Sequence, residues 1–126
     1  MRFSEDETTR LHKKLALEMG PVVRAALEDE RVVEICVNED GIVRVERLGV
    51  GFEVTTERLS TERVIGLLKT IATLQDQSIG RTNPVLESWI PTLGARIEGI
   101  LPPVSRHAVF SIRKHSRQVF SLQDYV

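Results

Sequence analysis

Residues 32–54, VVEICVNEDGIVRVERLGVGFEV, decide the fold, because apolar and polar residues alternate along them with a period of two. The alternation predicts three strands, at residues 32–37, 42–48 and 51–55. On the first strand it places one face apolar, with Val33, Ile35 and Val37. Glu39-Asp40-Gly41 and Gly49-Val50-Gly51 interrupt the pattern with residues that are typical of tight turns. The stretch therefore predicts an antiparallel meander.

Helices are predicted on both sides of this meander. Ser4 followed by Glu7 is a capping-box pattern, and apolar residues at helical spacing continue from it to about residue 19. Gly20-Pro21 ends this helix, and Pro21 can open a short second helix. Ser60 caps a further helix at about 61–76, whose apolar stripe consists of Val64, Leu67, Leu68, Ile71 and Leu74.

Three more strand patterns follow a polar loop, QDQSIGRTNP, at residues 86–90, 95–101 and 108–114. A chain of 126 residues is the size of one domain. The predicted fold is therefore a single α+β domain. It has a mostly antiparallel sheet of about six strands, N-terminal helices, and one helix between the two halves of the sheet.

The composition limits the classes of protein to which this chain can belong. Hydrophobic residues make up 41% of the chain and charged residues 28%, as in ordinary globular proteins, and no apolar run approaches the length of a membrane span. The first ten residues are polar and acidic, which does not match a signal peptide. One cysteine, Cys36, allows no internal disulfide and fits a reducing compartment. We therefore expect a cytosolic protein.

Charge is distributed unevenly. The first 62 residues contain 14 Asp and Glu and 9 Lys and Arg, so they are acidic. Residues 63–126 contain 4 Asp and Glu and 8 Lys and Arg, so they are basic. The segment 106–118 holds four cations and no carboxylate: Arg106, Arg113, Lys114 and Arg117. Such a segment attracts phosphate, nucleic acid or an acidic partner, or is simply a solvated basic edge.

Motifs for catalysis and metal binding are missing from the sequence. His12, His107 and His115 have no Cys or acidic residue beside them at metal-ligand spacing, so no metal site is predicted. Cys36 lies within a strand and is expected to be a buried structural thiol. The chain has neither a nucleophile elbow nor a P-loop. It therefore holds no complete active site.

Two arginines stand on the arms of a predicted hairpin, in ARIEGILPPVSRHAVFSIRK at residues 95–114. If the arms pair symmetrically across the Pro-Pro corner, Arg96 lies directly opposite Arg113 on one face. Like charges at such positions are unfavourable, so either a counter-charge or a bound anion is expected there. Glu98, two residues along the same face, is the local candidate for an ion pair. The guanidinium fork suits phosphate, and both alternatives stay open at this stage.

An ordered set of segments resembles the N-terminal domain of TrbB-type conjugal-transfer ATPases, which belong to the hexameric type II and type IV secretion ATPases. The segments are VVEICVNEDG, VRVERLG, LSTERVIGLLKTIATLQDQ, ARIEGILPPV, FSIRK and VFSLQDYV. They cover the chain from about residue 11 onward. One departure is visible, because the family commonly has Pro-Asp-Gly-Ser where this chain has Pro91-Thr-Leu-Gly-Ala.

The resemblance implies a PAS-like N-terminal domain over residues 1–126, packed on a RecA-like domain that this chain lacks. The resemblance further implies that ATP lies between the two domains, with Mg²⁺ held by the missing one. Arg96 and Arg113 would contact the terminal phosphate, and Asn83 and Pro84 would lie near the nucleotide base. The helix cap at Ser121-Leu-Gln-Asp124, directly before the last residue, agrees with a chain that continues into a linker helix.

For function, the resemblance implies a nucleotide-sensing and oligomerisation domain of a homo-hexameric ATPase for conjugative DNA transfer or type IV secretion. Such a protein would be cytoplasmic, peripheral to the inner membrane, and associated with other secretion components. Without a P-loop the fragment alone is expected to be inactive and to hold no cofactor. One alternative is a stand-alone module for an anion or an acidic partner. Another is nucleic-acid binding through residues 106–118, although Trp89 and Tyr125 look isolated and offer no aromatic platform, so no direct nucleic-acid binding is expected.

Overall fold

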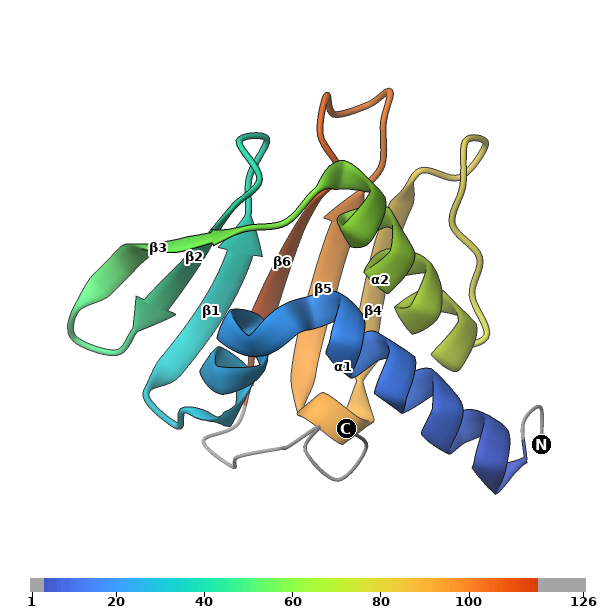
Figure 1. The fold of residues 1–126 in the computed structure, drawn as a ribbon, viewed down its shortest axis with the longest axis horizontal. Helices are drawn as coiled ribbons and strands as arrows, with labels where there is room; N and C mark the ends of the chain where they lie inside the picture. The colour runs from blue at the N-terminus through green and yellow to red at the C-terminus, as the bar shows by residue number, and fades with distance from the viewer. Residues whose placement is uncertain (1–3, 116–126) are drawn as a thin grey trace.

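The computed structural model describes residues 4–115, and both of its helices cover one face of a six-stranded sheet (Figure 1). The elements follow in the order α1 (Glu5–Glu28), β1 (Val32–Val37), β2 (Ile42–Arg47), β3 (Gly51–Arg58), α2 (Thr61–Leu74), β4 (Val85–Ile90), a 3-10 turn (Pro91–Leu93), β5 (Ala95–Ile100) and β6 (Val109–Lys114). The predicted α+β fold is confirmed. The basic residue Arg117 and the predicted cap at Ser121 lie outside the described residues.

The strands lie in the order β3-β2-β1-β6-β5-β4, and every neighbouring pair is antiparallel. The last strand in the sequence, β6, is thus inserted at the centre, where it joins the meander β1–β3 to the hairpin β4–β5. This insertion makes one continuous sheet from two halves that α2 separates in the sequence. Among residues 4–115, no helix lies on the opposite face of the sheet (Figure 1), and we call it the open face.

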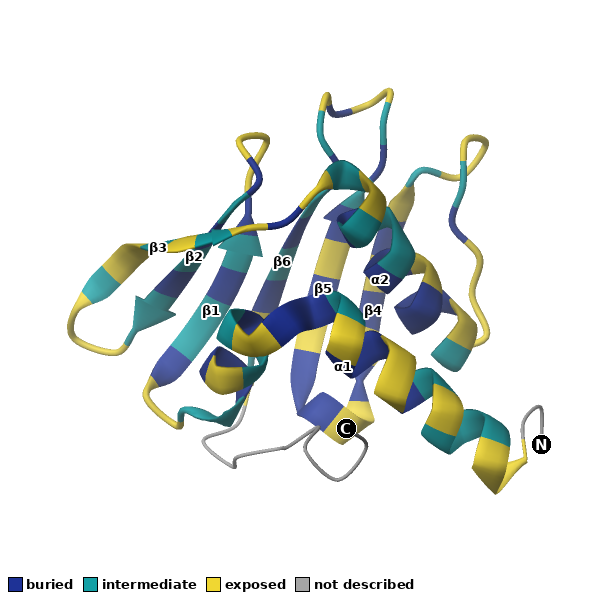
Figure 2. Cartoon of the chain, in the orientation of Figure 1, coloured by how far each residue is buried: buried dark blue, intermediate teal, exposed yellow. Residues whose placement is uncertain are grey.

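Burial alternates along the central strands, as Figure 2 shows for β5. Ala95, Ile97 and Gly99 are buried toward the helices, whereas Arg96 and Glu98 are exposed on the open face. On α2 the predicted stripe is buried, with Val64, Leu67, Leu68 and Ile71 all at 0% exposure. The alternation follows from the period of two in a strand, and on β5 it assigns Arg96 and Glu98 to the open face.

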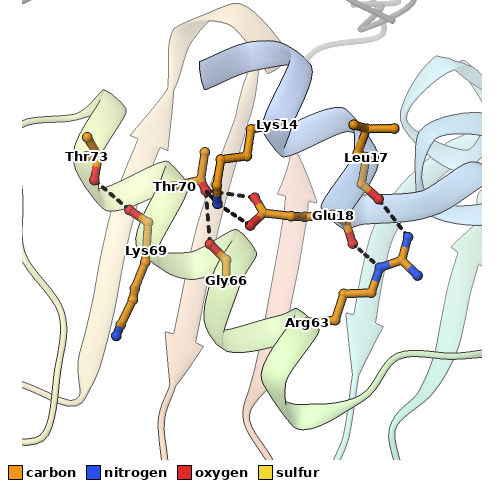
Figure 3. Close-up of polar contacts among 8 residues, drawn as sticks. All are labelled: Lys14, Leu17, Glu18, Arg63, Gly66, Lys69, Thr70 and Thr73. Carbon is orange, nitrogen blue, oxygen red and sulfur yellow. Dashed lines mark hydrogen bonds and ion pairs between the residues drawn. The ribbon is translucent and has the colours of Figure 1, made fainter. Parts of the chain in front are cut away.

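The break predicted at Gly20-Pro21 is present within α1. Gly20 has φ 80° and ψ 172°, a conformation that is essentially restricted to glycine, and helical residues continue after it to Glu28. Arg63 on α2 binds the backbone carbonyls at this break. Its guanidinium donates hydrogen bonds to the carbonyls of Leu17 at 2.6 Å and Glu18 at 2.7 Å (Figure 3). The two predicted N-terminal helices are therefore both present, as the two halves of α1 that meet at this break.

A second polar contact joins the helices beside this break. The carboxylate of Glu18 accepts hydrogen bonds from Lys14 and from the hydroxyl of Thr70, which itself donates to the carbonyl of Gly66 in the same helix (Figure 3). Lys69 points away from this cluster. Within residues 4–115, neither helix is both long and apolar enough to cross a membrane.

Several predicted boundaries are corrected by the structure. In β1 a register shift between Val32 and Glu34 buries Val32 at 2% exposure and leaves Val33 half-buried, so Val33 does not share the apolar face with Ile35 and Val37. β3 continues to Arg58, because it stays paired to Ile42 across a second shift. α2 ends at Leu74 rather than 76. β1 has the predicted bounds, whereas β2, β4, β5 and β6 each differ from the prediction by one residue at one end.

Candidate functional site

A row of side chains crosses the open face of the sheet on four strands. Trp89 on β4 pairs with Arg96 on β5, Arg96 pairs with Arg113 on β6, and Arg113 pairs with Glu34 on β1. The register predicted from the Pro-Pro corner is thereby confirmed. Both guanidinium groups stand on the face without helices, where a ligand or another domain can reach them.

The counter-charge for Arg113 comes from a distant part of the sequence. Its Nη2 donates to Oε1 of Glu34 at 2.6 Å, and Glu34 also accepts a hydrogen bond from the hydroxyl of Ser111 at 3.3 Å. The Glu34 side chain is 15% exposed, whereas that of Arg113 is 63% exposed. The ion pair of Glu98 with either arginine, which the sequence left as one alternative, is absent among residues 4–115. Sequence reasoning missed Glu34 because the two partners are 79 positions apart.

Arg96 is exposed, and within the described part of the chain its guanidinium has neither a hydrogen bond nor an ion pair. Its neighbours across the ladder are an aromatic ring, Trp89, and a second cation, Arg113. A like charge directly opposite destabilises a strand pair by some tenths of a kcal/mol, up to about 1 kcal/mol. Arg96 is therefore the group on this face that gains most from an added anion.

The two arginines line a hollow of about 320 Å³ together with Glu34, Glu98 and Ser111. Two guanidinium groups and two carboxylates balance the formal charge of this hollow. A phosphate group could form bidentate hydrogen bonds with the guanidinium of Arg96. To engage Arg113 fully it would have to replace the carboxylate of Glu34.

Trp89 is not isolated, contrary to the sequence-based interpretation. Its ring lies 5.5 Å from the ring of His115, with an angle of 68° between the planes, and 46% of the residue is exposed. The register also places it beside Arg96. Trp89 therefore adjoins the arginine hollow.

Asn83 and Pro84 lie at the other end of β4. The backbone of Asn83 bridges to Gly80, and its Nδ2 donates to the carbonyl of Ser78 at 2.9 Å. Trp89, the partner of Arg96, is five residues beyond Pro84, which is about 16 Å along an extended strand. The structure thus brings Arg96 and Arg113 together and leaves these two residues at a distance.

The remaining candidates have structural roles in the described residues. His12 is 4% exposed, and its ring nitrogens lie 2.8 Å from the carbonyl of Thr8 and 3.2 Å from the hydroxyl of Thr92. Within residues 4–115, no group of three or more His, Cys, Asp or Glu side chains could hold a metal ion. Cys36 is half-buried on the open face rather than fully buried, and burial raises the pKa of its thiol. A raised pKa makes the thiol a weak nucleophile.

The basic segment does not form one surface. Arg113 faces the open side, whereas Lys114 on the helix-covered side donates to the carbonyl of Asp29 at 2.7 Å, and burial lowers its pKa. Arg106 lies in the loop before β6, where its backbone N–H donates to Glu39. The alternation of a strand separates neighbouring cations, which argues against a nucleic-acid track here.

Comparisons with known proteins place this chain and its fold in a known family. No family model matches the sequence. The chain is 38% identical to "Probable conjugal transfer protein TrbB" of Sinorhizobium fredii over 93% of its own length and 36% of the relative. It is 35% identical to "Type IV secretion system protein VirB11" of Brucella suis, over 82% of this chain and 29% of that protein. The crystal structure of the Brucella suis VirB11 ATPase in complex with sulphate superposes with a TM-score of 0.75 at 29% identity, over 96% of this chain and 36% of that one.

The chain is a homologue of the TrbB conjugal transfer proteins and the VirB11 type IV secretion ATPases and corresponds to their N-terminal domain. It spans about a third of the length of the relatives that it matches. The resemblance of the sequence to TrbB-type ATPases is confirmed. The match to the VirB11 ATPase structure likewise confirms the expected class of fold, a helix-flanked antiparallel sheet.

Proposed function

We propose that this chain is the nucleotide-sensing and ring-forming domain of a homo-hexameric ATPase that drives conjugative DNA transfer or type IV secretion. In that assembly a RecA-like domain holds ATP and Mg²⁺, and the open face of the sheet supplies Arg96 and Arg113 to the terminal phosphate. The protein would act in the cytoplasm, peripheral to the inner membrane, together with other secretion components. Its relatives are named for conjugal transfer and type IV secretion, which supports this assignment.

One observation carries the proposal: Arg96 lies directly opposite Arg113 on a face that no helix covers. Two adjacent permanent cations stabilise the charge of a terminal phosphate, and ATP carries one phosphate more than ADP. Since a ligand shifts a conformational equilibrium only by its differential affinity, such contacts would favour the domain-closed state with ATP.

Turnover in the whole ATPase that contains this domain tests the proposal. Arg96→Ala and Arg113→Ala should each reduce ATP hydrolysis by about tenfold or more, while the ring still assembles. Arg44→Ala is the matched control, because Arg44 lies on the open face outside the hollow, paired with Asp40 at 2.7 Å. Unchanged turnover in both arginine variants would contradict a contact of Arg96 and Arg113 with the terminal phosphate.

The alternative of a stand-alone anion-binding module makes a different prediction for the isolated chain. Such a module has to bind its anion tightly without a second domain. Glu34 and Glu98 balance the two guanidinium charges in the hollow, which favours weak binding by the chain alone. Micromolar binding of inorganic tripolyphosphate by residues 1–126 would support the module.

A further inference from the structure

The two outer strands of the sheet expose apolar side chains beside unpaired edges. β3 and β4 lie at the two ends of the strand order, and within residues 4–115 no strand pairs with their outer edges (Figure 1). β3 exposes Phe52 at 52% and Val54 at 64%, and β4 exposes Val85 and Trp89 at 46% each. Such an edge is a template for pairing with another strand. The direction, register and backbone groups of the two edges indicate which strand fits there.

The two edges run in opposite directions. The sheet has six strands and every neighbouring pair is antiparallel, so β3 and β4 point opposite ways. When a second copy stands beside the first with its strands aligned and its β4 next to β3, these two strands are antiparallel. The open faces of both copies then continue into one another. A second copy of this chain therefore extends the sheet without breaking its alternation.

One row of the open face ends in an aromatic side chain at each edge. The row that begins at Trp89 and passes through the two arginines to Glu34 continues to Glu46 on β2 and to Phe52 on β3. Trp89 and Phe52 thus lie at the same level of the sheet, on the same face, at opposite edges. Copies joined through these two residues need no shift along the strands. A head-to-tail contact without such a shift can close into a ring.

The free edge of β3 presents two residues whose backbone groups point outward. The N–H of Leu48, at the end of β2, donates at 2.8 Å to the carbonyl of the residue that precedes β1. Successive residues of a strand direct their N–H and C=O groups to alternate sides, so Val45 faces β3 and bonds its partner Glu53. Phe52 and Val54, on either side of Glu53, therefore direct their groups to the free edge.

The free edge of β4 is fixed in the same way. The N–H of Leu101 donates to the carbonyl of Pro84 at 2.8 Å, so Pro84 faces β5. Strand residues at odd distances from Pro84 face the opposite side, and Glu87 and Trp89 are among them. Their N–H and C=O groups are available to a strand that approaches from outside.

The row register brings these outward groups together. Phe52 of one copy would face Trp89 of the next, and Val54 would face Glu87, so each pair could exchange both of its N–H···O bonds. The two aromatic rings would stand side by side on the open face, where cross-strand aromatic pairs are stabilising. Across residues 51–54 and 87–90, no two like charges would face one another. Direction, level and backbone groups thus all agree on one register.

We propose that β3 of one copy pairs with β4 of a second copy, antiparallel, with Phe52 opposite Trp89 and Val54 opposite Glu87. The contact is heterologous, because it uses a different edge of each copy and leaves one edge free at either end of a pair. The ring itself belongs to the proposed function, on which this inference rests for closure. The two strand edges are new as the contact that joins neighbouring copies.

The isolated chain should associate only weakly through this contact. A pairing of about four residues on each strand is much smaller than a stable interface, which has roughly 20–30 residues a side. In a closed ring each copy would be held by two such contacts, one at each edge. A covalent trap is therefore the suitable measurement for the chain alone.

Disulfide trapping tests the register directly. Val54→Cys and Glu87→Cys are introduced together with Cys36→Ser, which removes the one native cysteine. Directly opposite residues of a hydrogen-bonded pair have Cα atoms about 5.5 Å apart, within the range of a disulfide. Oxidation at millimolar protein concentration should give a ladder of dimers, trimers and larger species on a non-reducing gel. A mixture of the two single-cysteine chains should give dimers only, about tenfold more than either chain alone.

Matched variants separate this contact from chance collision. Val54→Cys with Val104→Cys should give no ladder, because Val104 is equally exposed at 64% but lies in the loop before β6. Adding Phe52→Lys should lower trapping between residues 54 and 87 by about fivefold or more, since a lysine on an edge strand opposes pairing. Leu17→Lys, on the exposed side of α1, should leave trapping unchanged. Circular dichroism checks that each variant is folded.

The outcomes distinguish this inference from the proposed function. Dimers from Val54→Cys alone, as many as from the mixture, would overturn the inference by pairing two β3 edges. Equal trapping with Phe52→Lys and Leu17→Lys would overturn the register. In the whole ATPase, a ring that assembles and needs Arg96 for turnover, but leaves the cysteine pair reduced, would overturn the edge contact and leave the proposed function standing. A ladder from the chain, with a whole ATPase that stays monomeric, would support the edge contact and overturn the proposed ring.

Discussion

The guanidinium of Arg113 and the carboxylate of Glu34 form a 2.6 Å ion pair on the open face of the sheet. This pair has two consequences for the site. It offsets the repulsion between Arg113 and Arg96, so the hollow can exist without an anion. It also places a negative charge where a phosphate would bind. Glu34 therefore competes with the ligand that the arginines would recognise.

Replacing Glu34 tests this competition. Glu34→Gln keeps a hydrogen-bond acceptor near Arg113 but removes one negative charge from the hollow. We expect affinity for tripolyphosphate to rise by about two- to fivefold, since an exposed charge pair contributes up to roughly 1 kcal/mol. Calorimetric titration at low ionic strength measures this change in affinity. Glu46→Gln is the control, because Glu46 lies beside Glu34 on β2 but outside the hollow. Weaker binding by Glu34→Gln would instead make Glu34 a positioning residue.

The contact of Arg63 with the bend in α1 predicts a loss of stability. Arg63→Ala removes both hydrogen bonds to the carbonyls of Leu17 and Glu18 and should lower the free energy of unfolding by about 1–3 kcal/mol. Urea denaturation followed by circular dichroism measures this change. Lys69→Ala is the matched control on the same helix, since Lys69 is exposed and should stay within about 0.5 kcal/mol. Equal midpoints for the two variants would contradict the role of Arg63.

Replacing Gly20, the one glycine of α1, should destabilise the protein. Its φ of 80° and ψ of 172° are strained for any side chain, and a Cβ there would lie 3.1 Å from Nη2 of Arg63. We expect Gly20→Ala to destabilise the fold by about 1–3 kcal/mol, measured by thermal unfolding. Gly80→Ala serves as the comparison, because no neighbour lies within 4 Å of its added Cβ. A melting temperature unchanged by Gly20→Ala would mean that α1 straightens without penalty.

Acid should weaken the fold through two aspartates. A hydrogen bond from Arg44 holds the pKa of Asp40 well below its usual value of 3.8, and the backbone N–H of Arg31 lowers that of Asp29. Because the folded-state pKa values are depressed, these carboxylates contribute stability above about pH 4 and lose it as pH falls further. Urea midpoints measured from pH 7 to pH 2 should therefore decline below pH 4. Asp40→Asn should flatten the decline, and a slope identical to that of the unsubstituted chain would exclude Asp40 as a source.

Patterns among neighbouring residues were enough to predict most of the helices and strands. Period-two alternation located the strands, and the caps at Ser4 and Ser60 located the helix starts, because these signals act between residues close in the chain. The symmetric hairpin predicted the pairing of Arg96 with Arg113 for the same reason. The alternation did not predict the bulge at Val33, since a bulge depends on the pairing with the partner strand β2.

By itself, the sequence determined which residues form strands and helices and which two arginines face each other, because backbone preference and hairpin register are local. Only the tertiary structure decided that β6 inserts beside β1, and this insertion brings Glu34 to Arg113. The physical reason is that strand order follows from how two halves of a sheet bury their apolar face under α1 and α2. The arginine hollow gains Glu34 on its wall only after that pairing is made.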